Sequence, residues 1–147
     1  MAGRIGGEKT RCGNLWTEAR FKSFIKGNLR NATRKWAPIS ECLKLARTRR
    51  GFYTCNGCKQ EVPNTTRDEN GKRIKNVLVD HIQPIIDPAT GWVSWDDTIE
   101  RMFTEIDNLQ VLCYDCHKAK TDSEKAVAKE RRQREKQDGS NEEDEDA

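Results

Sequence analysis

The stretch NLQVLCYDCHKAKT, residues 108–121, decides the fold, because it joins a strand pattern to a run of metal-ligand residues. Residues 108–113 are mostly apolar and predict a β-strand. Residues 114–120 predict a helical turn, and the Thr-x-x-Glu pattern from Thr121 predicts that a last helix begins there. Cys113 and Cys116 stand at the junction, and His117 is one of only two histidines in the chain.

A second pair of cysteines has the same spacing, in CNGC at residues 55–58. Each Cys-x-x-Cys turn can place two thiolates on one cation, so Cys55, Cys58, Cys113 and Cys116 together predict a tetrahedral structural zinc site. A redox dithiol and a structural iron site are the alternatives. Cys12 and Cys42 are left over, and we expect both to be free thiols.

The other histidine lies in LVDHIQP, residues 78–84, at the end of an apolar run. Neighbouring residues of a strand point to opposite faces, so Asp80 and His81 are expected to have different partners. A simple turn is the alternative, since Pro84 follows closely. If the four cysteines share one cation, this strand lies beside the helix of His117, and the two histidines converge.

Helical patterns precede these motifs. Residues 14–36 predict an amphipathic helix with Thr17 as its N-cap, an apolar face and an opposite basic face. A second helix is predicted from Pro38 to a C-terminal Gly51, with a basic last turn. Further along, residues 69–71 predict a hairpin tip and residues 74–82 a strand, and either Ser94 or one of the following Asp residues is predicted to start another helix.

Charge is distributed unevenly along the chain. The 27 Lys and Arg and the 24 Asp and Glu residues give a net charge of +3. Residues 1–50 hold 13 basic and 3 acidic side chains, whereas residues 138–147 hold six acidic and no basic ones. A basic body favours a polyanionic partner, with an ordinary solvated surface as the alternative. The acidic end has the composition of a disordered segment.

Four segments in this order, CNGC, VDHIQP, DNLQVLC and CYDCHKAKT, resemble the HNH endonucleases, in particular small phage-encoded HNH proteins. The resemblance covers about residues 52–121. It implies an α+β fold, in which a small ββα-metal core is stapled by the four-cysteine zinc site and flanked by N-terminal basic helices and a C-terminal helix. We therefore expect a flexible N-terminus over residues 1–14, a basic helical segment over 15–51, a nuclease domain over 52–136 and a disordered acidic tail over 137–147.

The resemblance also implies roles for single residues in metal-dependent hydrolysis of DNA. His81 is expected to be the general base, and Asp80 and His117 to bind a catalytic divalent cation. Asn108 is expected to orient His81, with an Asx turn as the alternative. Mg²⁺ is the expected cation, and Mn²⁺, Ni²⁺ or Zn²⁺ are alternatives. The residues expected to contact DNA are Lys22, Lys26, Arg30, Arg34, Arg47, Arg49, Arg50, Lys118 and Lys120.

Two other functions fit the same residues: a non-catalytic zinc-knuckle module that binds nucleic acid, and a phage packaging accessory protein. The expected partners are DNA and phage packaging or replication proteins. No apolar run approaches the length of a membrane span, and no signal-peptide pattern is present, so we expect a cytoplasmic protein, in the bacterial host if it is phage-encoded.

Overall fold

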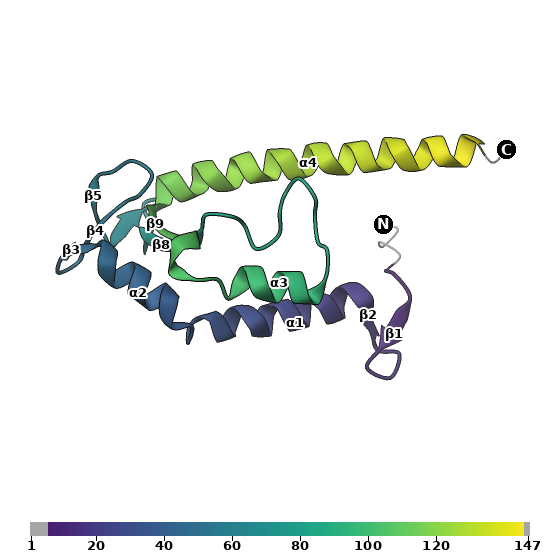
Figure 1. Cartoon of the computed structure of the whole chain (residues 1–147), viewed down its shortest axis with the longest axis horizontal. Helices are drawn as coiled ribbons and strands as arrows, with labels where there is room; N and C mark the ends of the chain where they lie inside the picture. Colours follow the sequence, from purple (N-terminus) through teal and green to yellow (C-terminus); the bar gives the residue numbers. More distant parts are fainter. Residues whose placement is uncertain (1–5, 146–147) are drawn as a thin grey trace. The chain divides into compact units, whose positions relative to one another are not determined.

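The computed structural model describes residues 6–145, and their side chains through residue 139. Within these residues the fold is mixed α+β, with four α-helices and several small antiparallel sheets (Figure 1), which confirms the predicted fold class. The chain divides into two compact units, Met1–Trp36 and Ala37–Ala147. This boundary lies earlier than the predicted one at residue 51, because the second helix packs within the second unit.

The first unit is a small hairpin followed by a helix. Strands β1 (Lys9–Arg11) and β2 (Trp16–Thr17) pair antiparallel, and helix α1 spans Glu18–Thr33. Thr17 caps α1 as predicted, since its hydroxyl accepts from the backbone N–H of Arg20 at 3.2 Å. The hairpin occupies part of the segment that was expected to be flexible up to residue 14. Residues 1–5 lie outside the described residues.

Aromatic rings on α1 and β2 contact one another rather than a core. The rings of Trp16 and Phe24 meet edge to face at 5.3 Å, and the guanidinium of Arg20 lies 4.5 Å from the Trp16 ring centre. No residue of α1 is buried, and Phe24 is 50% exposed. A unit of this size has too few apolar side chains to enclose a core, so the predicted apolar face of the helix stays partly exposed.

The second unit has its core where helix α2 (Ala37–Ala46) packs on two paired strands, β8 (Val77–His81) and β9 (Leu109–Cys113), which are called the central hairpin below. Cys42 of α2 is buried together with Val77, Leu109 and Val111. The prediction for the end of this helix was wrong: the helix ends at Ala46, well before the predicted C-terminal Gly51. Arg47–Arg49 instead form strand β3, which pairs with β4 (Phe52–Thr54), while β4 also pairs with β5 (Glu61–Pro63).

Side-chain contacts across this sheet explain why the basic segment is a strand. The Arg49 guanidinium lies 3.9 Å from the centre of the Phe52 ring, and its Nε donates to Glu61 at 2.9 Å. Such cross-strand pairs stabilise the extended chain and can outweigh the favourable helix propensity of arginine.

Strands β8 (Val77–His81) and β9 (Leu109–Cys113) form the central antiparallel hairpin. Both strands were predicted, but β8 is separated from β7 (Arg73–Lys75) by Asn76. The buried Asn76 amide donates to the carbonyl of Pro63 at 2.9 Å and accepts from the backbone N–H of Tyr114 at 3.1 Å. Asn76 therefore leaves the sheet to satisfy backbone groups of two other segments.

The hairpin tip at residues 69–71 and the start of a helix at Ser94 were predicted correctly, whereas strand β6 (Thr65–Arg67) was not predicted. Strand β6 pairs with β7 around a turn in which Gly71 has a φ of 77°, the left-handed conformation that glycine adopts most easily. Helix α3 (Trp95–Met102) begins at the predicted Ser94 cap, whose hydroxyl accepts from the backbone N–H of Asp97 at 3.1 Å. A 3₁₀ turn, η1 (Ile106–Asn108), then leads into β9.

Helix α4 (Tyr114–Glu145) is continuous from the end of β9. The predicted helical turn and last helix are therefore one element, and Thr121 lies inside it rather than capping it. The helix also covers residues 137–145, which were expected to be disordered. Glu, Lys, Arg and Gln dominate α4, and their favourable helix propensities account for its length. Asp146 and Ala147 lie outside the described residues.

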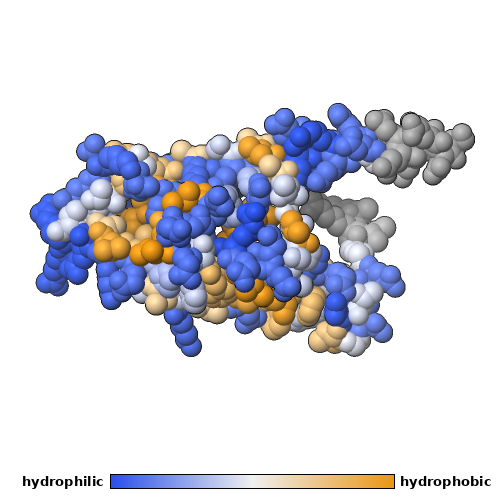
Figure 2. Space-filling view, viewed as in Figure 1, coloured by the Kyte–Doolittle hydropathy of each residue, from blue (hydrophilic) through white to orange (hydrophobic). Residues whose placement is uncertain are grey.

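Hydrophilic and hydrophobic residues are interspersed on the face of the molecule seen in Figure 2. Among the described helices, none is both long enough and apolar enough to cross a membrane.

Candidate metal and catalytic site

The four cysteines of the two Cys-x-x-Cys pairs converge, as predicted from their spacing. Cys55 and Cys58 lie on the turn between β4 and β5, Cys113 ends β9, and Cys116 lies in the first turn of α4. Their sulfur atoms all lie within 4.8 Å of one another. Four cysteine sulfurs at such separations are the donor set that a structural zinc ion favours, so this cluster could hold a metal ion.

The turn from β4 to β5 brings its backbone very close to α4. A Cβ atom added to Gly57 would lie 3.0 Å from both Cβ and Sγ of Cys116, so a larger residue would push the two cysteine pairs apart. The turn is closed by two backbone hydrogen bonds of 2.9 Å, from Lys59 N–H to the Cys55 carbonyl and from Cys55 N–H to the Gln60 carbonyl. Glycine at position 57 therefore permits the approach that the cluster needs.

The surroundings of the cluster separate the pKa values of its thiols. Burial alone would raise the pKa of Cys55, but backbone N–H groups of Cys113, Cys58 and Gly57 point to its sulfur and lower the pKa to about 6. The Cys113 N–H lies 3.2 Å from that sulfur. Burial raises the pKa of Cys113, and a hydrogen bond with Cys113, followed by burial, raises the pKa of Cys116 to about 12. Without a cation, one thiolate at Cys55 thus faces two thiols at neutral pH.

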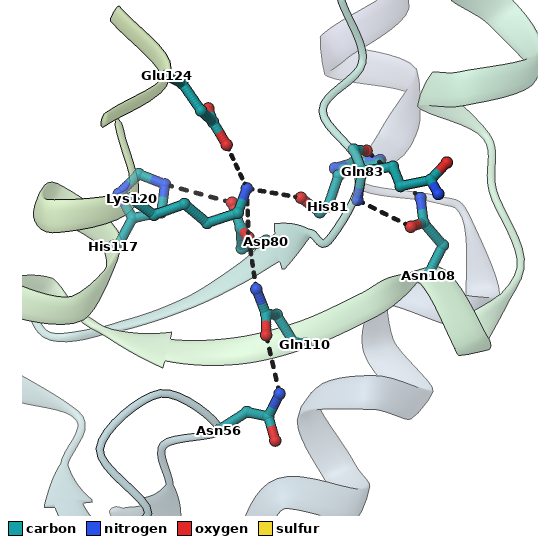
Figure 3. Close-up of polar contacts among 9 residues, drawn as sticks. All are labelled: Asn56, Asp80, His81, Gln83, Asn108, Gln110, His117, Lys120 and Glu124. Atoms are coloured by element: carbon teal, nitrogen blue, oxygen red, sulfur yellow. Dashed lines mark hydrogen bonds and ion pairs between the residues drawn. The ribbon is translucent and has the colours of Figure 1, made fainter. Parts of the chain in front are cut away.

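A second cluster of polar side chains, called the Asp80 cluster below, lies where strands β8 and β9 meet α4 (Figure 3). It consists of Asp80, Gln110, His117, Lys120 and Glu124. The Asp80 carboxylate accepts through Oδ2 from Gln110 Nε2 at 2.9 Å, and the same oxygen lies 3.1 Å from Lys120 Nζ. Its other oxygen, Oδ1, faces His117 Nε2 at 3.8 Å. This last separation is too long for a hydrogen bond, so the two atoms are held near each other without being bonded.

Lys120 joins the two elements of this cluster. Its ammonium contacts Asp80, donates to the backbone carbonyl of His81 at 3.0 Å and pairs with Glu124 one turn further along α4. Burial alone would lower the pKa of Lys120, but the hydrogen bonds to Glu124 and Asp80 outweigh burial and raise it. The lysine therefore stays charged and offsets one of the two negative charges of Asp80 and Glu124.

His81 has a different partner, as strand alternation predicts. Its Nε2 lies 2.9 Å from the backbone carbonyl of Met102, at the end of α3. A carbonyl oxygen can only accept, so Nε2 carries the proton and donates it, and the neutral ring has its free lone pair on Nδ1. The two histidines thus differ in their surroundings: His117 faces Asp80, whereas His81 is anchored on α3.

Asn108 holds the backbone that follows His81. Its side-chain Oδ1 accepts from the backbone N–H of Gln83 at 2.9 Å, its Nδ2 lies 3.4 Å from the Gln83 carbonyl, and its own carbonyl accepts from Ile82 N–H at 2.9 Å. These contacts fix the chain just after β8, and with it the position of His81.

The structure gives the predicted metal ligands unequal support. Within the part of the chain that it describes, the four cysteines are the one group of three or more ligand atoms close enough together to share a cation. Asp80 and His117 offer two ligand atoms, so any further positions on a cation there would fall to water or phosphate oxygens.

The basic residues expected to contact DNA lie in three settings. Lys22, Lys26 and Arg30 follow one stripe of α1, and Arg34 is its C-cap residue. Arg47 and Arg50 are exposed beside the paired Arg49, and Lys118 is exposed on α4. Lys120 differs from the others, because its ammonium is engaged inside the Asp80 cluster.

Sequence reasoning missed Gln110, Asn56 and Glu124, all of which belong to the polar contacts of Figure 3. Gln110 lies directly opposite Asp80 across the hairpin, a relation that depends on strand register. Glu124 was available from the sequence, since it follows Lys120 by four residues on a helix.

Comparison with protein-family models, curated proteins and solved structures finds no match to this chain.

Proposed function

We propose that this protein is a metal-dependent endonuclease of the HNH type, which hydrolyses phosphodiester bonds of DNA. One observation carries the proposal: Asp80 Oδ1 and His117 Nε2 face each other at 3.8 Å, and the residue that follows Asp80 in the chain is a histidine whose Nδ1 is left to accept a proton. A nuclease needs these groups together, whereas a module that only binds nucleic acid needs none of them.

Asp80 and His117 would hold the divalent cation in this proposal. A carboxylate and an imidazole on neighbouring elements are suitable ligands, and two protein ligands leave room for substrate. The bound cation would stabilise negative charge on the phosphate and on the leaving oxygen. Mg²⁺ is the first candidate, because carboxylate and water are the ligands it prefers.

His81 would act as the general base. The bond from its Nε2 to the Met102 carbonyl fixes the ring and its tautomer, so Nδ1 is the atom that takes a proton from water. The Asn108 contacts to Gln83 hold the adjoining backbone, which keeps the ring in place. Asp80 would not act as the general base, because its side chain is engaged with Gln110 and Lys120.

The four-cysteine cluster would bind zinc and serve a structural purpose in this proposal. All four of its positions are sulfur, so a tetrahedral ion there has no open position for substrate. Its contribution is to join the β4–β5 turn to the start of α4, and so to fix the helix that carries His117. The stripe of basic residues on α1 would contact DNA phosphates.

A second candidate function is supported by the ion pair between Lys120 and Asp80. At 3.1 Å from Lys120 Nζ, the Asp80 carboxylate already has a positively charged partner, so it can be held in place without a cation. This arrangement suits a non-catalytic zinc-knuckle module that binds nucleic acid, and a packaging accessory protein would need no more.

Incubation of the full chain with supercoiled plasmid across a series of divalent cations separates these candidates. The nuclease should produce nicked or linear DNA only with a divalent cation, and His81→Ala should slow this by about 10²- to 10⁴-fold, the usual contribution of a general base. Gel-shift assays on the same samples measure DNA binding. Binding without cation-dependent cleavage would favour the second candidate.

A further inference from the structure

A chain of hydrogen bonds connects the turn of the first cysteine pair to the Asp80 carboxylate (Figure 3). Lys59 Nζ donates to Asn56 Oδ1 at 2.7 Å, and Asn56 Nδ2 donates to Gln110 Oε1 at 2.8 Å. Gln110 Nε2 then donates to Asp80 Oδ2 at 2.9 Å. Asn56 lies between the cysteines of CNGC, so the chain begins inside the metal-ligand turn.

The two ends of this chain fix its direction. An ammonium group has only donors, and an ionised carboxylate has only acceptors. Lys59 therefore takes the oxygen of Asn56, which leaves the nitrogen of Asn56 for Gln110. The nitrogen of Gln110 is then left for Asp80, so neither amide can be reversed without losing a hydrogen bond.

Strand pairing places Gln110 where it can act on Asp80. The two residues are partners across the β8–β9 hairpin, and directly opposed side chains lie on the same face of a sheet. Gln110 and Lys120 both engage Oδ2, which turns Oδ1 toward His117. Without the glutamine, the carboxylate would keep the lysine, but the hydrogen bond that sets its rotation would be missing.

We propose that Gln110 is a positioning residue, which orients Asp80 as a cation ligand and couples that ligand to the four-cysteine turn through Asn56. This inference rests on the proposed function. In this proposal Gln110 acts through its hydrogen bond to Asp80 and is not itself a ligand of the cation. The backbone N–H of Asn56 also donates to the Val111 carbonyl at 2.8 Å, so the turn is attached to the strand of Gln110.

The decisive variant is Gln110→Met, which keeps the length of the side chain and removes both hydrogen bonds. Calorimetric titration of the full chain with Mg²⁺, and separately with Mn²⁺, should show about 10- to 100-fold weaker binding, the usual effect of removing a hydrogen-bond partner of a metal ligand. Metal analysis should show the cysteine-bound metal unchanged. Gln60→Met is the matched control, because it makes the same change at an exposed residue of the β4–β5 turn.

Asn56→Ala tests the coupling to the turn. Asn56 is exposed, so water can replace part of its hydrogen bond, and the loss of cation affinity should be smaller than in Gln110→Met. In the double variant Asn56→Ala with Gln110→Met, no further loss is expected, because both changes interrupt the same chain. Additive losses would overturn the coupling and leave Gln110 acting alone.

Plasmid nicking distinguishes the failure of this inference from failure of the proposed function. If Gln110 acts by positioning, the rate lost in Gln110→Met at low Mg²⁺ should return to within a few-fold of the parent at saturating Mg²⁺. A Gln110→Met protein with parental cation affinity, in a chain that still nicks DNA, would overturn the positioning role only. A parent chain that binds no Mg²⁺ or Mn²⁺ beyond its cysteine-bound metal, and does not nick, would overturn the proposed function and this inference with it.

Discussion

The four-cysteine cluster and the Asp80 cluster both join the central hairpin to the first turns of α4, but they differ in the number and kind of ligand atoms that they offer to a cation. The cysteine cluster offers four identical donors within 4.8 Å, with Gly57 clearing the way. The Asp80 cluster offers one carboxylate oxygen and one imidazole, and a lysine already shares the carboxylate. The first is suited to hold an ion permanently, whereas the second, in the proposed function, would exchange one.

The largest effect expected from this contrast is the loss of the cysteine-bound metal. Cys113→Ser should unfold much of the second unit, because the binding free energy of a structural zinc, about 10–16 kcal/mol, is comparable to the whole stability of a domain. Thermal melting by circular dichroism and metal analysis measure this. Cys12→Ser is the matched control: Cys12 is exposed in the first unit, and its replacement should leave the melting temperature unchanged.

Substitution of Asp80 or of its neighbour His81 should remove the proposed nuclease activity and leave the fold intact. Both His81→Ala and Asp80→Ala should reduce plasmid nicking by about 10²-fold or more. Only Asp80→Ala should also lose the calorimetric signal of Mg²⁺ binding, because His81 is engaged with Met102 and not with the cation. Equal loss of Mg²⁺ binding in both variants would make His81 a ligand.

Acidification should weaken the binding of a cation by the four cysteines. A cation binds thiolates, whereas the raised pKa values of Cys113 and Cys116 keep both thiols protonated at neutral pH without it. Binding must therefore release protons, and each proton released makes the affinity fall about 10-fold per pH unit of acidification. Zn²⁺ competition titrations between pH 6 and 8 measure this slope. A pH-independent affinity would contradict the assigned protonation states.

The smallest effect concerns the basic stripe of α1. Reversing the charge of Lys22, Lys26, Arg30 and Arg34 together should weaken DNA binding and reduce the slope of log affinity against log salt by up to about 0.9 for each phosphate that the helix no longer neutralises. Fluorescence anisotropy at several salt concentrations measures it. Lys44→Glu, on α2, is the control, and an unchanged slope in the reversed helix would place the DNA on other basic residues.

Local patterns predicted much of this structure, and partners distant in sequence decided the rest. Thr17 and Ser94 are caps whose action depends on residues three positions away, and the cysteine spacing is itself a local geometry. The end of α2 could not be predicted, because the pairing of β3 with β4 determines it. Gln110 was missed for a similar reason: its value depends on lying opposite Asp80, which only the register establishes.

Both clusters include residues of α4, and this determines how an insertion or deletion in the helix would affect them. Each residue of an α-helix turns the following side chains by about 100°. Cys116 and His117 are adjacent, so the angular phase between the two clusters is set by that single step. One residue inserted after Cys116 would leave the cysteines in place and rotate His117, Lys120 and Glu124 together away from Asp80. A change of chain length here would therefore displace three side chains from Asp80 at once, whereas a substitution changes only one.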